Sequence, residues 1–178
     1  MVDFDVTAEQ VLWQGALLKA GTETYRYRDG KEKTYEKVWH PGAVAVVPYD
    51  QRHVWLVRQP REASRQTALL EIPAGKCDRP NEPLLALAKR ELIEETGKLA
   101  GSWQMVFEFF PSPGFCDERL TLFAATDLSD VEGGAQPDGD EQIEIVAWPL
   151  SDIPAAISST QDGKTLVALL WLARQLGV

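Results

Sequence analysis

Apolar positions from Val11 onward recur in short runs, many of them β-branched or aromatic, that are separated by turn signals. The runs TETYRYR (22–28) and KTYEKVW (33–39) flank an Asp-Gly pair, which predicts two antiparallel strands joined by a hairpin turn. The near-continuous apolar run AVAVVPYD (43–50) predicts a buried strand, and VWLVRQP (54–60) predicts the strand beside it. The first third of the chain is therefore expected to be β-structure.

The period of the pattern changes after one more candidate strand, TALLEIP (67–73). Apolar residues then recur at helical spacing, which predicts a helix from about Glu82 to Thr96. Asn81 is placed to be the N-cap of this helix, and Gly97 is placed to follow its last turn. The segment thus predicts one amphipathic helix between strands.

Three further runs predict strands at 103–110, 119–128 and 141–150, and two apolar-striped segments at 151–158 and 162–176 predict helices. Strands, one helix, strands and two helices form an α+β order, and we expect one sheet-built domain with packed helices. The polar, Gly-rich segment 129–140 is expected to be an exposed, mobile loop.

Composition narrows the class of protein. The chain has 178 residues, of which 44% are hydrophobic and 25% charged, as in ordinary soluble proteins. A net charge of −9 argues against binding to nucleic acid or to an anionic membrane surface. Cys77 and Cys116 fit no metal-binding spacing, and the start has no signal-peptide pattern. We therefore expect a cytoplasmic protein with free thiols and no membrane partner.

Three carboxylates, Glu91, Glu94 and Glu95, fall on one face of the predicted helix. Like charges at this spacing repel by a few tenths of a kcal/mol, about 0.2–0.5 for each pair, so something should compensate. One explanation is a solvated face on which Arg90 pairs with Glu94. The other is a hard divalent cation such as Mg²⁺, which prefers oxygen ligands and leaves positions for substrate phosphate.

A glycine at position 75 lets the backbone bend just ahead of the helix, which can aim the carbonyl of Ala74 toward the same cation. With these features, residues 75–98 (the box) resemble the Nudix box: Gly, five residues, Glu, seven residues, then Arg-Glu-aliphatic-x-Glu-Glu-x-Gly-aliphatic. The matching residues are Gly75, Glu82, Arg90, Glu91, Leu92, Glu94, Glu95 and Gly97. There are two departures. Six residues, not five, separate Gly75 from Glu82, and Lys98 occupies the last aliphatic position.

The resemblance to the Nudix family implies a mixed β-sheet packed between helices, an α/β/α sandwich, with an N-terminal antiparallel β extension. It implies a boundary between an extension at 1–40 and a Nudix hydrolase domain at 41–178. In the resembling subfamily the extension pairs with a second subunit and helps to build an adenine pocket, which implies a homodimer. Ordinary cross-strand packing also explains most of the aromatic residues in this region.

The stretches HPGAVAVVP, VRQPREA, EIPAGK and FFPSPGFCDERLTLFAATDL look like those of the ADP-ribose pyrophosphatases. That subfamily implies hydrolysis of ADP-ribose to AMP and ribose 5-phosphate with Mg²⁺, or Mn²⁺ as a possible substitute. One alternative is the same reaction on another nucleotide sugar or dinucleotide, such as an ADP-sugar, GDP-mannose or NADH. Another is a module that binds ADP-ribose without cleaving it.

The resemblance also assigns roles to individual residues. Glu91, Glu94 and Glu95, with the carbonyl of Ala74, would hold the metal, and Arg90 would orient that cluster. Glu94 and Arg90 would thereby serve catalysis directly.

Substrate-binding candidates lie outside the box. Arg61 matches an arginine that contacts phosphate or the distal ribose, and Arg58 is a second candidate. Glu71 and Glu118 are candidates for metal or ribose contacts on position alone, with a solvated strand-end acid as the alternative. The catalytic base is expected in the acidic segment PDGDEQIEI (137–145), with Glu141 favoured, Asp140 next and Glu144 third.

Overall fold

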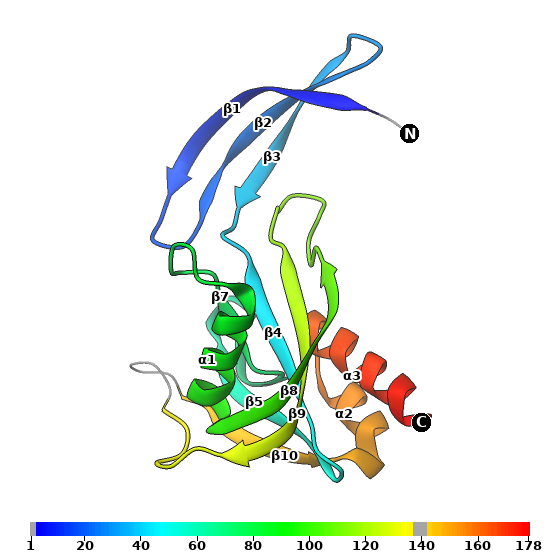
Figure 1. Ribbon diagram of the computed structural model, residues 1–178. Helices are drawn as coiled ribbons and strands as arrows, with labels where there is room; N and C mark the ends of the chain where they lie inside the picture. Colours follow the sequence, from blue (N-terminus) through cyan, green and yellow to red (C-terminus); the bar gives the residue numbers. More distant parts are fainter. Residues whose placement is uncertain (1–2, 137–141) are drawn as a thin grey trace. The chain divides into compact units, whose positions relative to one another are not determined.

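The computed structural model describes residues 3–136 and 142–178 (Figure 1). The chain divides into two compact units. The first unit comprises Met1–Gly42 and Phe109–Leu120, and the second comprises Ala43–Glu108 and Thr121–Val178. Each unit is described by itself.

The first unit is built on a three-stranded antiparallel sheet in the order β1-β2-β3, drawn in blue in Figure 1. Its strands are β1 (Phe4–Gln14), β2 (Lys19–Tyr27) and β3 (Glu32–Trp39). The predicted hairpin between β2 and β3 is confirmed, with Gly30 in its turn at a φ of 83°. The sequence pattern missed the start of β1, because every residue of this strand is exposed and no buried face imposes a strong alternation.

The segment Phe109–Leu120 joins this sheet along β3. The N–H of Val38 donates to the carbonyl of Phe115 at 2.8 Å, and the N–H of Asp117 donates to the carbonyl of Val38 at 3.3 Å. The Asp117 carboxylate also accepts from the N–H of His40 at 2.8 Å. A loop far along the chain is thus tied to the last strand of the N-terminal sheet.

Two sheets form the second unit, in the orders β7-β4-β9-β8 and β10-β5-β6. Their strands are β4 (Ala43–Pro48), β5 (His53–Arg61), β6 (Gln66–Glu71), β7 (Ala74–Lys76), β8 (Lys98–Phe109), β9 (Leu120–Asp130) and β10 (Glu144–Pro149). Short 3₁₀ turns lie at Glu62–Ser64 and Leu150–Asp152. The strands expected from the sequence are therefore present, together with the short β7.

The predicted pairing of β4 with β5 is wrong. β5 pairs with β6 and β10, whereas β4 lies between β7 and β9. Both edges of β4 are occupied: the N–H of Val46 donates to the carbonyl of Pro73, and just past its end the N–H of Tyr49 donates to that of Ala125. Consecutive strands pair often but not always, and here strands from later in the chain take both positions.

Helix α1 (Leu84–Thr96) covers one side of these strands, and α2 (Ile153–Ser159) and α3 (Gly163–Leu176) cover the other (Figure 1). This layering confirms the predicted α+β class with strands packed between helices.

The predicted start of α1 needs a correction, while its end is as expected. Pro83, not Asn81, occupies the N-cap position, and Asn81 instead adopts a φ of 61° in the turn before it. Proline suits this place because its fixed φ leads into a helix. Gly97 ends α1 as predicted, with a φ of 65° and its N–H donating to the carbonyl of Ile93.

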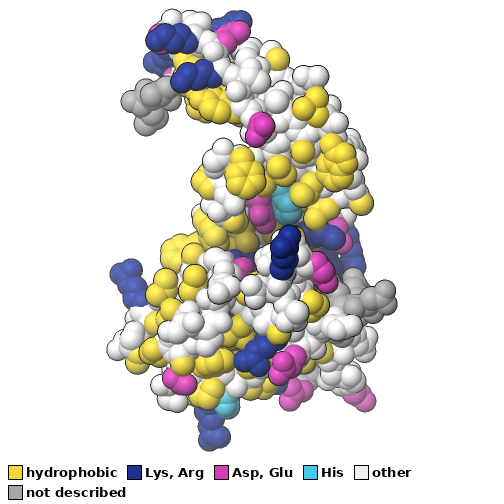
Figure 2. Space-filling model, turned by 180° about the vertical axis from the view of Figure 1, so that it is seen from behind, with side chains coloured by type: hydrophobic (Ala, Val, Ile, Leu, Met, Phe, Trp, Pro, Cys, Tyr) yellow, Lys and Arg dark blue, Asp and Glu magenta, His cyan; other side chains and the backbone are white. Residues whose placement is uncertain are grey.

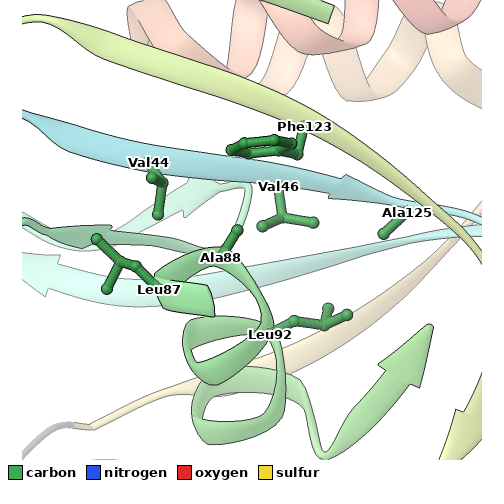
Figure 3. Close-up of a cluster of buried hydrophobic side chains, with 7 residues drawn as sticks. All are labelled: Val44, Val46, Leu87, Ala88, Leu92, Phe123 and Ala125. Carbon is green, nitrogen blue, oxygen red and sulfur yellow. The ribbon is translucent and has the colours of Figure 1, made fainter. Parts of the chain in front are cut away.

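One face of α1 is anchored in the core of the second unit (Figure 3). Leu87, Ala88 and Leu92 are buried and point toward the side chains of β4 and β9. The whole cluster is Val44, Val46, Leu87, Ala88, Leu92, Phe123 and Ala125. Burying one leucine side chain contributes about 2 kcal/mol. This packing fixes the rotation of α1 and therefore the direction of its acidic face.

None of the helices in the described ranges is long and apolar enough to cross a membrane.

Candidate active site

Arg90 of α1 lies at the centre of the box. Its Nη1 is 2.9 Å from a carboxylate oxygen of Glu91 and 2.9 Å from one of Glu94. On its other side, Nε and Nη2 donate to Glu82 at 3.3 and 3.2 Å, and Nη2 is 3.3 Å from Asp78. One guanidinium therefore gathers four carboxylates and offsets their mutual repulsion.

The electrostatics of Arg90 follow from this crowding. Burial by itself lowers the pKa of a guanidinium, but the hydrogen bond to Glu82 and the charges of Glu91 and Glu94 raise the pKa of Arg90 well above its ordinary value. The side chain stays charged at any physiological pH. It can hold the carboxylates in place without taking or giving a proton.

The backbone of β7 approaches the acidic face of α1 closely. The N–H of Ala74 donates to Oε2 of Glu95 at 3.2 Å, and Glu95 is only 4% exposed. At Gly75, an added Cβ would lie 2.1 Å from Cδ of Glu91, so a side chain here would push the Glu91 carboxylate out of its present position. The glycine thus lets the β7 backbone lie directly against the Glu91 side chain.

Chemically, this donor set fits a hard divalent cation. Carboxylate and carbonyl oxygens are the ligands that Mg²⁺ prefers, and Glu91 and Glu94 already converge on one cationic nitrogen. Among the residues that the structure describes, no three Asp, Glu, His or Cys side chains are grouped tightly enough to hold a metal ion. The contacts above account for this, since Arg90 draws Glu91 and Glu94 to itself while Glu95 accepts from Ala74.

A second charged cluster lies at the ends of β5 and β6. Arg61 donates to both oxygens of Glu71, through Nε at 2.6 Å and Nη2 at 2.8 Å. Lys164, in the first turn of α3, lies 2.5 Å from Oε2 of the same carboxylate. Glu71 is 1% exposed. The structure thus places Glu71 between two protein cations.

The pKa of Glu71 reflects these partners. Burial raises the pKa of a carboxyl group, but the hydrogen bond from Arg61 and the charge of Lys164 outweigh burial and lower the pKa of Glu71 below its ordinary value. A lowered folded-state pKa means that the ionised pair stabilises the fold above the unfolded pKa. This stabilisation is lost as the pH falls through the lower folded value.

Arg58 and Arg61 belong to the same strand but contact different carboxylates. Arg58 faces Glu144 of β10 across the strand pair, with 3.5 Å between Nη1 and Oε1. Arg58 and Glu144 line a cavity of about 320 Å³ together with Gln59, Thr67 and Gln142. Glu144 is thus held by a cation in the structure.

Three predicted site residues remain: Glu118, Asp140 and Glu141. Glu118 belongs to the first unit, where its carboxylate is 3.9 Å from Nδ1 of His40. That nitrogen accepts the N–H of Gly42 at 3.1 Å. Glu141, the favoured base, and Asp140, its nearest alternative, lie outside the described residues.

Both departures from the box have a structural explanation. The longer turn before Glu82 carries Asp78, which contributes the fourth carboxylate around Arg90. Lys98 places its ammonium 3.7 Å from the ring centroid of Trp55 and 2.5 Å from Asp130, so its stem packs where the pattern has an aliphatic residue.

Sequence reasoning missed Asp78 and Lys164 as members of these clusters. Asp78 lies in the turn before the helix, and its distance of twelve residues from Arg90 is not a helical spacing. Lys164 is 93 residues from Glu71, and nothing local in the sequence connects the two. The sequence feature that could have pointed to Lys164 is the Asp-Gly-Lys run at 162–164, where the last predicted helix begins.

Comparisons with known proteins find similar sequences and a similar fold. The sequence profile of the NUDIX domain matches residues 39–170. An ADP-ribose pyrophosphatase of Bacillus subtilis (strain 168) is 36% identical over 168 residues, which cover 93% of this chain and 90% of the relative. A methanol dehydrogenase activator of Bacillus methanolicus is 32% identical over 173 residues, covering 96% and 92%. The crystal structure of an ADP compounds hydrolase superposes with a TM-score of 0.82 at 22% identity, covering 97% and 93%, and so shares the fold.

Proposed function

This chain belongs to the Nudix family, and we propose that it hydrolyses the diphosphate linkage of ADP-ribose to give AMP and ribose 5-phosphate. The observation that carries the proposal is the arrangement of Glu91, Glu94 and Glu95 around Arg90 and the β7 backbone. The similarity to an ADP-ribose pyrophosphatase over nearly the whole length of both proteins supports the substrate class.

Mg²⁺ is the proposed cofactor, with Mn²⁺ as a possible substitute. Glu91, Glu94 and Glu95, together with the carbonyl of Ala74, would hold it. When bound, such a cation neutralises charge on a diphosphate and makes a bound water a better nucleophile at neutral pH. Arg90 holds Glu91 and Glu94 close together, and β7 fixes Glu95, so the chain itself supplies an ordered set of oxygen donors.

Arg61 is the proposed contact to substrate phosphate. Its Nε and Nη2 donate to Glu71. The side chain is 42% exposed, so the guanidinium can also reach a ligand. A guanidinium suits this role because its planar fork donates to two phosphate oxygens. Arg58 and Glu118 stay secondary candidates.

The base that activates water is proposed to come from the segment ahead of β10. Glu141 is the first candidate and Asp140 the second. Glu144, the third, pairs with Arg58. A carboxylate near a bound cation stays ionised and can accept a proton from water.

The activity is tested by incubating the protein with Mg²⁺ and, in parallel, ADP-ribose, an ADP-sugar, GDP-mannose or NADH. We expect the highest kcat/KM on ADP-ribose, equal amounts of AMP and ribose 5-phosphate, and loss of activity when EDTA removes the metal. Faster hydrolysis of another compound would move the assignment to that substrate. Tight binding of ADP-ribose without any product would instead identify a binding module.

We also propose that the protein is a homodimer and that the extension formed by residues 1–40 is its dimerisation element. Large apolar side chains are exposed throughout the first unit, and yellow side chains gather on its surface in Figure 2. The exposed residues are Phe4, Val6, Val11, Leu12, Trp13, Leu17, Tyr35, Phe110 and Phe115. An exposed apolar surface of this extent is typical of a protein interface.

Sedimentation velocity of the wild-type chain should give the mass of a dimer. Leu12, which is 67% exposed, lies in β1, and Leu12→Asp should shift the protein to a monomer because it buries a charge in the interface. The matched control is Leu170→Asp in α3, where the leucine is 56% exposed in the second unit. A monomeric wild type would refute the dimer, and dissociation by both variants would refute the assigned surface.

A further inference from the structure

Three charged side chains from three separate elements meet at Glu71, and one of them has no role in the site described above. Arg61 ends β5, Glu71 ends β6, and Lys164 lies in the first turn of α3. Oε1 of Glu71 accepts from Nε of Arg61, whereas Oε2 is shared between Nη2 of Arg61 and Nζ of Lys164. Both oxygens are therefore committed to protein cations.

Lys164 is held firmly in this position. Its Nζ is also 3.0 Å from Asp162, whose carboxylate caps α3 by accepting the N–H of Thr165 at 2.9 Å. The hydroxyl of Thr165 in turn accepts the N–H of Ile72 at 2.8 Å, immediately after Glu71. The start of α3 is therefore tied to the backbone that carries Glu71, and Lys164 can move little relative to the carboxylate.

The three groups differ in exposure, and this gives the cluster a direction. Glu71 is 1% exposed and the Lys164 side chain 14%, but the Arg61 side chain is 42% exposed. A buried carboxylate with a second, enclosed cation can rotate less than one that Arg61 alone would hold. Arg61 is therefore the outward end of a chain of contacts that starts in α3.

We propose that Lys164 is a positioning residue, which holds Glu71 so that Glu71 fixes the orientation of the Arg61 guanidinium toward substrate phosphate. This inference rests on the proposed function, because it assigns Arg61 to the phosphate. Lys164 itself does not contact substrate. Its effect passes through Arg61, and this is the property that separates it from a directly binding lysine.

The test is a double-mutant cycle of Lys164→Met and Arg61→Lys, assayed on whichever nucleoside diphosphate compound the wild type cleaves best. We expect Lys164→Met to raise KM about tenfold and to change kcat less than about twofold, and Lys164→Arg to restore KM. In the Arg61→Lys background, Lys164→Met should add little, because contacts in one network are not additive. The control is Arg174→Met, an exposed cation of the same helix.

A second readout does not depend on activity. In ¹⁵N NMR spectra, the Nε–H of Arg61, assigned by its loss in Arg61→Lys, should exchange slowly in the wild type and in Lys164→Arg but rapidly in Lys164→Met. The positioning role would be overturned if the two substitutions raised KM by independent factors that multiply in the double variant. It would also be overturned if the Nε–H of Arg61 still exchanged slowly in Lys164→Met. A wild type that cleaves no such compound would refute the proposed function alone, and the exchange measurement would still decide the role of Lys164.

Discussion

Replacing Glu95 by glutamine is expected to lower kcat/KM about 1,000-fold while the fold is preserved. The change removes one negative charge from the proposed metal ligands, and a loss of this size corresponds to about 4 kcal/mol of transition-state stabilisation. Glutamine has the same shape, and its side-chain oxygen can still accept the N–H of Ala74. Glu95 is only 4% exposed and lies among like charges, so removal of its charge relieves repulsion and offsets the weaker hydrogen bond. The free energy of unfolding should therefore change by less than about 1 kcal/mol.

Steady-state kinetics over a range of Mg²⁺ concentrations, together with urea unfolding, measure both quantities. Lys89→Gln is the matched control, since it also changes the charge of α1 by one unit but at an exposed position outside the cluster. We expect this control to keep wild-type kinetics. Wild-type activity in Glu95→Gln would refute the assignment of Glu95 to the metal, and global unfolding would show that its role is structural.

Replacing Arg90 by methionine should reduce the free energy of unfolding by about 3 kcal/mol, the largest stability effect that we expect at one residue. The guanidinium is 14% exposed, and its loss leaves Glu82, Glu91 and Glu94 close together without the cation that offsets their repulsion. Methionine fills a similar volume, so the effect reports charge and hydrogen bonding rather than a cavity. Activity should fall as well, because Glu91 and Glu94 would move apart.

Arg90→Lys separates the two contributions. A lysine keeps the positive charge but cannot donate to several carboxylates at fixed angles, so we expect a smaller loss of stability than in Arg90→Met. Urea denaturation at neutral pH measures both variants against the wild type. Equal stability of Arg90→Met and the wild type would mean that the four carboxylates are relieved by solvent rather than by Arg90.

Local patterns in the sequence determined several elements of this protein. Helical spacing of apolar residues and a glycine at position 97 defined α1 and its end, and the Asp-Gly turn defined the hairpin of β2 and β3. These predictions succeed because each depends on residues within one or two turns of each other. The same spacing placed Glu91, Glu94 and Glu95 on one face before any tertiary contact was known.

Tertiary structure decided what local spacing cannot express. β4 pairs with β7 and β9 rather than with β5. The pairing of a strand depends on which strands pack beside it in space, and local spacing does not contain that information. Asp78 reaches Arg90 from a turn, and Lys164 reaches Glu71 only because the start of α3 is bonded to the end of β6. The sequence by itself determined the acidic helix face and its chemistry. The fold decided which cations hold those acids, since such contacts depend on distance in space and not on distance along the chain.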